Sequence, residues 1–404
     1  MLNKRRQQNQ TMSQNTHLIY LDHAATTPMD PRVLEVMTPY FTDIFGNPGG
    51  VYAMGRKAAR AVDDAREMTA EILHCRPTEV IFTGGGSESD NLAIKGISAS
   101  LRKRGSHIIT SSIEHHAVLH TCQALEQQGF TVTYLPVDSS GKVQVEDVEQ
   151  ALTPETILVS IMTANNEIGT IQPIAEIGAL LRSNRIAFHT DAVQAAGYLN
   201  LNVAHMQVDS LSLSAHKFYG PKGVGIVYLR TGQRITPLIH GGSQERNRRA
   251  GTENVAGIVG AAYALQLAQQ EREQESARLI ALRDMLIQKL ISAIPNITLT
   301  GHPVDRLPNN ASFAIKGIEG EALLLNLDVA GIAASSGSAC TSAVIDPSHV
   351  LIALGVGPEY NRGHLRLTMG HTTTEEDVLR TAEALPPMIE ALRSLGAPSA
   401  AAKR

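Results

Sequence analysis

The chain has 404 residues, 43% of them hydrophobic, and a formal net charge of −4 at pH 7. Its length suits roughly two or three domains of about 150 residues, and its charge gives no electrostatic reason to expect nucleic acid or an anionic membrane surface as a partner. Three widely separated cysteines, Cys75, Cys122 and Cys340, form neither a disulfide framework nor a paired metal motif, which favours a reducing compartment such as the cytoplasm.

Residues 1–17, "MLNKRRQQNQTMSQNTH", are predicted to form a disordered polar tail. The segment contains basic residues but lacks the apolar stretch of a secretory signal peptide. An amphipathic transit peptide is the alternative, which the near absence of an apolar face disfavours. Elsewhere no apolar run approaches the ~18 residues needed to cross a membrane, so we expect no membrane partner.

Residues 18–270 are predicted to form a large wound α/β domain, because β-branched runs alternate there with helical stretches. Packing of its first residues on the smaller domain is the alternative for that end. Most runs are apolar on both faces, as in mostly parallel sheets that helices cover on both sides. The predicted strands are 79–83, 106–112, 156–162, 185–191, 209–217 and 224–229. In such sheets ligands bind beyond the carboxyl ends of the strands.

Polar side chains gather at these carboxyl ends. Five of the strand ends read "TGGGSES", "IEHHA", "TANNE", "HTDAVQ" and "SAHK". Loops are commonly polar, but five successive ends that mix acid, base and amide groups predict a ligand site.

Residues 271–404 are predicted to form a smaller α+β domain. Leucines at helical spacing, Leu279, Leu282, Leu286 and Leu290, predict a long amphipathic helix that leads into this domain and ends at Pro295. The strands "ASFAIKG" and "HLRLTM" follow, and "TTTEEDVLRTAEAL" has the threonine caps and early acids of a helix start.

The glycine-rich turn "TGGGSES" is a candidate anion site. It joins a strand to a helix that opens at Ser87, which aims backbone N–H groups and the positive helix end at the space above. No Gly-Lys-Ser/Thr follows, as a P-loop requires, and the third glycine of a dinucleotide fingerprint is absent. A tight turn without a ligand is the alternative.

Lys217 and Asp191 complete a chemical pattern around this turn. Lys217 ends a strand of Leu and Ser, where a partly desolvated amine can act as a nucleophile and suits a Schiff base. Asp191 closes the preceding predicted strand, where a buried carboxylate can keep a ring nitrogen protonated. With an anion cradle nearby, the implied cofactor is pyridoxal phosphate; a solvated lysine at a strand end is the alternative.

The motifs resemble those of the class V aminotransferase family, and specifically the NifS/IscS type of cysteine desulfurase. They run in order from about residue 18 to about residue 385 as "IYLDHAATTP", "TGGGSESDNLAIKG", "EHHAVL", "NNEIGTIQPI", "HTDAVQ", "SLSAHKFYGPKG", "RAGTENV" and "SSGSACTS". The resemblance implies the type I fold of pyridoxal phosphate enzymes, with a mostly parallel seven-stranded sheet and a homodimer whose active sites lie at the subunit boundary.

The resemblance also implies a role for each site residue. Lys217 would be the Schiff-base lysine, Asp191 the partner of the pyridine nitrogen, and His115 would stack on the ring. Gln194 would reach the phenolic oxygen of the cofactor. The remaining roles are phosphate binding by Gly86, Ser87, Ser214 and His216, completion of that cradle by Thr252 from the neighbouring subunit, and binding of the substrate carboxylate by Asn166 and Arg366.

Cys340 lies in "SSGSACTS", among residues too small and polar to pack a core. A thiol that must reach a substrate and attack it suits such a mobile Gly/Ser loop. The resemblance implies that Cys340 takes sulfur from L-cysteine as a persulfide, releases alanine and passes the sulfur to an acceptor such as an iron–sulfur scaffold. The ending "SLGAPSAAAKR" does not resemble the segment with which housekeeping members bind that scaffold.

The other cysteines and the His115–His116 pair receive plainer interpretations. Cys75 and Cys122 are expected to be buried structural thiols. His115 and His116 are expected to point to opposite faces of a strand, which argues against a shared metal, and no metal is predicted.

Two other functions remain open. Another class V enzyme, such as a selenocysteine lyase or an aminotransferase, is the first. A degenerate binding protein without activity is the second, against which the intact Lys217, Asp191 and Cys340 stand.

Overall fold

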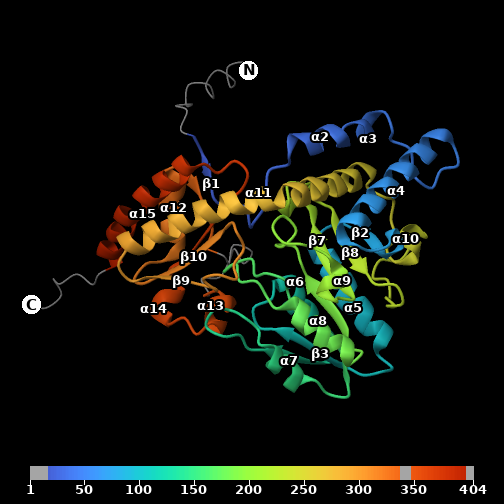
Figure 1. The fold of residues 1–404 in the computed structure, drawn as a ribbon, viewed down its shortest axis with the longest axis horizontal. Coiled ribbons are helices and arrows are strands. Elements are labelled where there is room, and N and C mark those ends of the chain that lie inside the picture. The colour runs from blue at the N-terminus through green and yellow to red at the C-terminus, as the bar shows by residue number, and fades with distance from the viewer. Residues whose placement is uncertain (1–16, 337–346, 397–404) are drawn as a thin grey trace, which may run out of the picture.

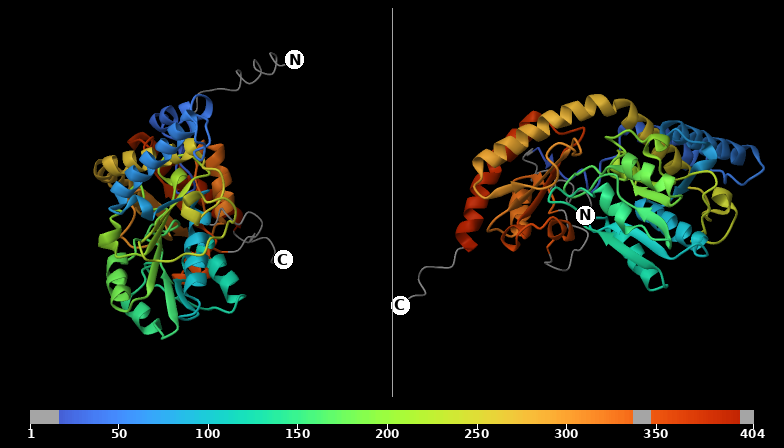
Figure 2. Two further views of the ribbon diagram at one scale, coloured as in Figure 1. Left: turned by 90° about the vertical axis from the view of Figure 1, so that its right-hand side faces the viewer. Right: turned by 60° about the horizontal axis from the view of Figure 1, so that its bottom comes forward.

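The computed structural model describes residues 17–336 and 347–396. The chain folds into two lobes, and one long helix, α11 (Val255–Ala293), runs along both of them (Figures 1 and 2). No helix in the described ranges is both long and apolar enough to span a bilayer.

The larger lobe is built on a seven-stranded sheet in the order β2-β8-β7-β6-β5-β3-β4. Neighbouring strands are parallel except at β8, which runs antiparallel to both β2 and β7. This arrangement confirms the predicted fold class. The strands are β2 (Val80–Thr83), β3 (His107–Ser111), β4 (Thr131–Leu135), β5 (Thr156–Ser160), β6 (Ala187–Asp191), β7 (Ser210–Ser214) and β8 (Gly225–Leu229).

Six of these strands overlap predicted strands, whereas β4 was not predicted. The predicted strand 209–217 is too long, because β7 ends at Ser214 and Lys217 lies in the 3-10 turn η2 (Ala215–Lys217) that follows. It forms one edge of the sheet, and only its last residue, Leu135, is buried. An edge strand that is half exposed lacks the continuous apolar run by which the other strands were found.

Helices cover both faces of this sheet, because successive side chains of each strand point to opposite sides. The helices of this lobe are α2 (Pro31–Met37), α3 (Pro39–Thr42), α4 (Ala53–Leu73), α5 (Gly86–Leu101), α6 (His116–Glu126), α7 (Val145–Ala151), α8 (Ile174–Ser183), α9 (Val203–Met206) and α10 (Gln244–Asn247), with short 3-10 turns η1 (Pro77–Glu79) and η2 (Ala215–Lys217). Ile109 packs on one face with α4, α8, α9 and the first half of α11, whereas Ile108 packs on the other with α5 and α6.

The smaller lobe combines a three-stranded antiparallel sheet, in the order β12-β10-β9, with a two-stranded parallel pair of β1 and β11. Its sheet strands are β9 (Ile297–Leu299), β10 (Asn310–Ile315) and β12 (His364–Thr368), and the pair is β1 (Ile19–Tyr20) with β11 (Ile332–Ala333). Its helices are α12 (Gly320–Val329), α13 (His349–Ala353), α14 (Pro358–Asn361) and α15 (Glu375–Gly396). The first strand of the chain therefore packs in the lobe that the last third of the chain builds.

The start of α15 confirms the predicted capping threonine. Thr374 Oγ1 accepts the backbone N–H of Asp377 at 3.1 Å, and the Asp377 carboxylate accepts the N–H of Thr374 at 2.9 Å. This reciprocal pair satisfies two N–H groups that a helix start leaves without partners.

The long helix α11 belongs to both lobes. Its first half, with Ile258 and Leu265, packs in the core of the larger lobe, and its second half contributes Leu279, Leu286 and Leu290 to the core of the smaller one. The leucine repeat was predicted, but the start of the helix at Val255 was not. In the first half of α11, buried glycines and alanines lie on several sides of the helix. The sequence therefore shows no apolar stripe at helical spacing there.

Candidate active site

A cavity of about 320 Å³ lies at the carboxyl edge of the parallel strands. Asp191 ends β6, Ser214 ends β7, and Lys217 ends the turn that follows. His115 at the start of α6 and Arg366 from β12 complete the wall. Both lobes therefore contribute to one site, at the edge where the strand pattern predicted it.

Lys217 is held at this cavity by the first turn of the chain after β1. Its Nζ donates to the carbonyl oxygens of Ala24 and Ala25 at 2.6 and 2.7 Å. Gln194 Nε2 donates to the same Ala24 oxygen at 2.9 Å. These carbonyls fix the amine beside the cavity wall rather than in solvent.

Asp191 belongs to a buried acidic pair. Its Oδ1 accepts the N–H of Val193 at 2.9 Å, and burial raises its pKa to about 6, while that hydrogen bond and Lys217 act in the opposite direction. Burial, and then the charge of Asp191, raise the pKa of Asp90 well above its ordinary value. Asp90 therefore keeps its proton more readily than Asp191 does. Asp191 is the carboxylate that is available to a cationic group in the cavity.

His115 is a neutral ring with a defined tautomer. Burial, and then the charge of Lys217, lower its pKa to about 4. Its Nδ1 accepts the N–H of Ala117 at 3.1 Å, so the proton of the neutral ring resides on Nε2. The ring is thus available for stacking and can donate a hydrogen bond from Nε2.

His115 and His116 do not occupy a strand, so the expected strand geometry is wrong. His115 is the N-cap of α6 and His116 its first residue, and their ring centroids are 6.3 Å apart. "EHHAVL" begins three residues after the end of β3, and the helix begins within it because His115 itself can cap the helix. Among residues 17–336 and 347–396 no group of three or more His, Cys, Asp or Glu side chains could hold a metal ion.

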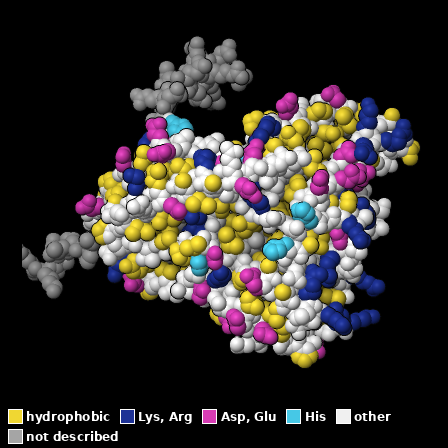
Figure 3. Space-filling model, in the orientation of Figure 1, with side chains coloured by type: hydrophobic (Ala, Val, Ile, Leu, Met, Phe, Trp, Pro, Cys, Tyr) yellow, Lys and Arg dark blue, Asp and Glu magenta, His cyan; other side chains and the backbone are white. Residues whose placement is uncertain are grey.

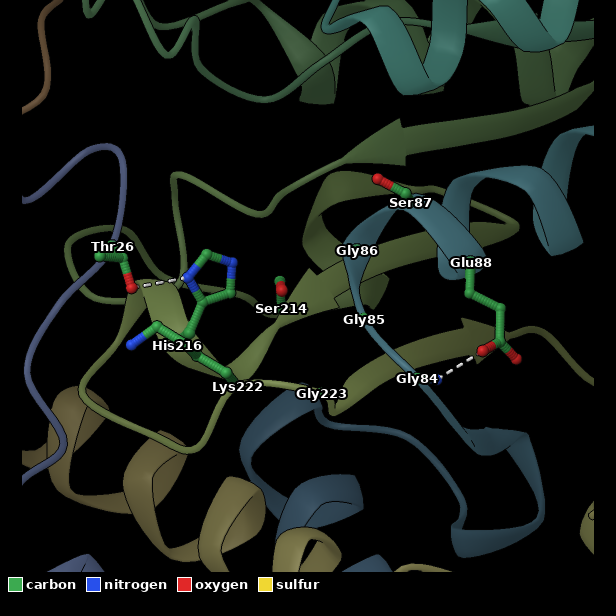
Figure 4. Close-up of a pocket in the computed structure, with 10 residues that line it drawn as sticks. All are labelled: Thr26, Gly84, Gly85, Gly86, Ser87, Glu88, Ser214, His216, Lys222 and Gly223. Carbon is green, nitrogen blue, oxygen red and sulfur yellow. Dashed lines mark hydrogen bonds between the residues drawn. The ribbon is translucent and has the colours of Figure 1, made fainter. Parts of the chain in front are cut away.

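A second hollow, of about 390 Å³, adjoins the cavity and shares Gly86, Ser87, Ser214 and His216 with it (Figure 4). All four residues expected to bind phosphate thus lie together. Burial, and then Lys217, lower the pKa of His216 to about 4, and its Nδ1 lies 3.0 Å from Thr26 Oγ1.

Glycine is required on the floor of this hollow. Gly85 has a φ of +150°, which side chains disfavour. A Cβ at Gly86 would come within 3.0 Å of Val193 and 3.2 Å of Ser214. The turn therefore presents bare backbone N–H groups at the start of α5, which is an anion-binding arrangement.

Glu88 links the glycine turn to the segment before α11. Its Oε2 accepts the N–H of Gly84 at 2.7 Å, and its Oε1 accepts Arg249 Nε at 2.9 Å. Thr252 follows three residues later and is exposed, and it lines neither the cavity nor the hollow. Among the predicted site residues that the structure describes, Thr252 is therefore the one that lies away from the site within its own chain.

Arg366 and Asn166 lie together on the cavity wall, as predicted. Arg366 Nη1 donates to the backbone oxygen of Asn166 at 2.9 Å, and Nη2 pairs with Asp22 Oδ1 at 2.8 Å. The Nε of Arg366 is buried without a hydrogen-bond partner among the described residues. A buried guanidinium with a donor to spare suits a carboxylate ligand.

Several residues of the site have no predicted role, among them Asp22, Thr26, Asp90 and Lys222. Asp90 had a usable signal, since it shares one helical face with Ile94 and Ile97, and an acid on an apolar face is unusual. Asp22, Thr26 and Lys222 carried no such signal, because their roles depend on contacts between distant segments.

Cys340 lies outside the described residues. Cys122 is buried in α6, as expected, and Cys75 is half-buried after α4. Burial raises the pKa of both thiols to about 12, so neither is a thiolate at neutral pH.

Comparison with known proteins places the chain in a family. A family model described as Aminotransferase class-V matches residues 19–381. The chain therefore belongs to the class-V aminotransferase family, which has pyridoxal phosphate-dependent members. Within it the chain groups with the cysteine desulfurases of the NifS/IscS type, which confirms the resemblance seen in the motifs.

Three relatives support this grouping. A protein from Clostridium botulinum (strain Hall) named cysteine desulfurase IscS is 53% identical over 380 residues, or 93% of this chain and 96% of that protein. A solved structure titled as a NifS-like protein has a TM-score of 0.88 at 39% identity and covers 93% of this chain and 100% of its own. A structure of SspA in complex with cysteine has a TM-score of 0.76 at 38% identity, with coverage of 87% and 98%.

Glu114, directly before His115, makes the stability of the protein depend on pH. It is fully buried, Oε1 accepts from Ser111 and from the N–H of Met162, and burial raises its pKa from 4.5 to about 8. A raised pKa stabilises the folded state fully below pH 4.5, and this stabilisation is lost as the pH rises toward 8. Relative to a Glu114→Gln variant, the natural chain is therefore expected to lose a few kcal/mol of unfolding free energy between pH 5 and 9.

Urea unfolding at a series of pH values measures this difference. A matched Glu149→Gln variant alters an exposed carboxyl and should track the natural chain at every pH. A difference between the natural chain and Glu114→Gln that stays constant from pH 5 to 9 would refute the assignment.

Proposed function

We propose that this protein is a cysteine desulfurase, which uses pyridoxal phosphate to remove sulfur from L-cysteine and leave it on Cys340. The observation that carries the proposal is the junction of two hollows. One offers an amine at Lys217 and a carboxylate at Asp191, and the adjoining one offers bare backbone N–H groups for an anion. The chain's relatives named cysteine desulfurase support the same reaction.

The residues fit this cofactor. Lys217 would hold its aldehyde carbon, Asp191 would pair with its ring nitrogen, and the glycine turn with Ser87 and Ser214 would hold its phosphate. His115 would lie against the ring face, and the requirement for glycine at position 86 leaves room for phosphate oxygens beside the helix start. When bound, the cofactor supplies an electron sink for carbanion chemistry at the substrate α-carbon.

Arg366 and Asn166 orient the substrate. A cysteine carboxylate at this wall would take the unpartnered Nε–H of Arg366 and share the guanidinium with Asp22. Arg366 comes from β12 and Asn166 from the turn that follows β5, and together they would fix the amino acid with its α-carbon toward Lys217. A solved relative, SspA, is recorded in complex with cysteine.

Lys217 and His115 divide the proton chemistry. The Lys217 amine lies at the cavity and would carry the proton that leaves the substrate α-carbon. His115 has a pKa of about 4 and is a weak base at neutral pH, so its contribution is a hydrogen bond donated from Nε2.

Cys340 completes the reaction. Its thiolate attacks the sulfur of the substrate, so that a sulfur–sulfur bond forms and the bond between that sulfur and the substrate β-carbon breaks. The electron pair of the broken bond stays on carbon, which takes up a proton and becomes the methyl group of alanine. Cys340 retains the sulfur as a persulfide, which an acceptor thiol can attack.

Mass spectrometry after mixing the holoenzyme with cysteine tests this function. We expect one added sulfur atom on the peptide that contains Cys340, and we expect Cys340→Ala to keep the visible absorbance of the cofactor while sulfide release is lost. Cys75→Ala is the matched control and should release sulfide normally. Unchanged release by Cys340→Ala would point instead to a lyase or aminotransferase, and a chain that takes up no cofactor would point to a binding protein.

We further propose a homodimer that delivers sulfur to an acceptor such as an iron–sulfur scaffold in the cytoplasm. Large apolar side chains on α3 and before α4 remain exposed, with Phe41 61%, Phe45 67% and Val51 89% accessible. Figure 3 shows hydrophobic side chains among polar and charged ones at the upper right, where Figure 1 places α3. A second copy of the chain would cover such a surface, and exposed Thr252 lies on a loop available to that copy.

A further inference from the structure

Four arginines surround a hollow of about 310 Å³ far from the candidate active site. Arg104 follows α5, Arg182 and Arg185 lie at the end of α8, and Arg230 follows β8. Ala187, the first residue of β6, also lines the hollow, whereas Asp191 at the other end of that strand lines the active-site cavity. The arginine hollow therefore opens at the opposite edge of the same sheet.

The positive charge in this arginine hollow is largely uncompensated. Asp209 is the one carboxylate that lines it, and its Oδ1 pairs with Arg230 Nε at 2.5 Å while its Oδ2 accepts the N–H of Phe188 at 2.9 Å. Within the described residues Arg104, Arg182 and Arg185 form no ion pair. Four guanidinium groups against one carboxylate leave three positive charges facing a single hollow.

Such an arrangement is unfavourable without an anion. Like charges gathered around one hollow repel one another, and an anion bound between them would relieve this repulsion. The backbone keeps two of the lining residues, Arg185 and Gln207, in the left-handed region with a φ of 57° each. Figure 3 shows a group of Lys and Arg side chains at the lower right, over the part of the molecule where Figure 1 places α5.

The geometry of the guanidinium group indicates which anion fits. Its planar fork forms paired hydrogen bonds with phosphate oxygens, and several forks around one hollow favour an anion with more than one phosphate. Gln207 and Gln233 add amide groups to the wall. The volume of this hollow is at the lower end of the range for small-ligand sites, which is roughly 300–1,000 Å³. A hollow of this size admits a diphosphate group but leaves little room for a longer phosphate chain.

We propose that the arginine hollow binds a diphosphate group, either as free pyrophosphate or as part of a nucleoside diphosphate. Binding would neutralise the three unpaired guanidinium groups and tie the ends of α5, α8 and β8 together at the lower edge of the sheet. The proposal does not depend on the reaction at the other edge.

Isothermal titration calorimetry of the full-length holoenzyme tests the proposal, because bound pyridoxal phosphate occupies the other anion hollow. Pyrophosphate and ADP are titrated separately at physiological salt, with inorganic phosphate for comparison. We expect saturable binding of pyrophosphate at least tenfold tighter than that of phosphate. Equal affinity for ADP would indicate a nucleotide site, and weaker ADP binding a site for the free anion; either result supports a diphosphate site.

The variant Arg182→Gln/Arg185→Gln is expected to weaken pyrophosphate binding at least tenfold. Both side chains are exposed, so the fold and the visible absorbance of the cofactor should not change. Arg60→Gln, which removes an exposed arginine from an ion pair with Asp64 on α4, is the matched control and should bind normally.

Three outcomes would overturn the proposal. They are the absence of saturable pyrophosphate binding, binding that the double variant leaves unchanged, and binding only of an acidic protein or of nucleic acid with no affinity for either diphosphate. The last outcome would identify the surface as a macromolecular interface instead.

Discussion

Replacing Lys217 by alanine is expected to reduce the rate of sulfide release from cysteine by roughly 10³-fold or more, since the amine serves both to hold the cofactor and to move a proton. The carbonyl oxygens of Ala24 and Ala25 hold Nζ at the cavity, and a second amine at that place is absent among the lining residues of the cavity. Steady-state kinetics with added pyridoxal phosphate measures the loss.

A control separates loss of chemistry from loss of charge. Lys57→Ala removes an exposed lysine from α4 and should leave the rate unchanged. Borohydride reduction of the natural holoenzyme, followed by peptide mapping, should mark Lys217. A mark on any other lysine, or near-normal turnover by Lys217→Ala, would contradict the assigned role.

Replacing Arg366 by glutamine is expected to lower kcat/KM for cysteine by about 100-fold or more, because truncation of a buried charged partner costs about 2–5 kcal/mol. Arg366 is buried and also pairs with Asp22, so loss of activity alone could reflect a damaged fold. The informative readout is therefore a ratio of substrates.

Cysteamine, which is cysteine without the carboxylate, provides that ratio. The natural enzyme should strongly prefer cysteine to cysteamine, and Arg366→Gln should largely lose this preference whatever its absolute rate. Asp22→Asn keeps Arg366 but weakens its competing ion pair, so this variant should lower KM for cysteine. A preference that survives in Arg366→Gln would show that another group reads the carboxylate.

The chemistry at the carboxyl ends of the strands could be predicted from the sequence because it depends on local pattern. Asp191 and Lys217 each end a short apolar run, and a parallel sheet must bring such ends to one edge. The glycine turn was equally visible, since the strand, the turn and the helix start are contiguous at residues 80–87.

Features that depend on distant contacts could not be predicted in this way. The carbonyls of Ala24 and Ala25 contact Lys217 across more than 190 residues of sequence, and Asp22 contacts Arg366 across more than 300. The helical state of His116 was missed, because a histidine such as His115 is an unusual N-cap. No local pattern could locate the arginine hollow either, since Arg104, Arg182 and Arg230 come from three separate elements.

The helix α11 has a consequence for how this molecule denatures. Each lobe completes its core with one half of the same 39-residue helix, and a continuous hydrogen-bonded rod joins the two halves. Melting either lobe removes half of the packing of this helix, and tertiary packing provides most of the stability of a helix in a protein. Heat should therefore dismantle both lobes in one cooperative transition, seen calorimetrically as a single peak.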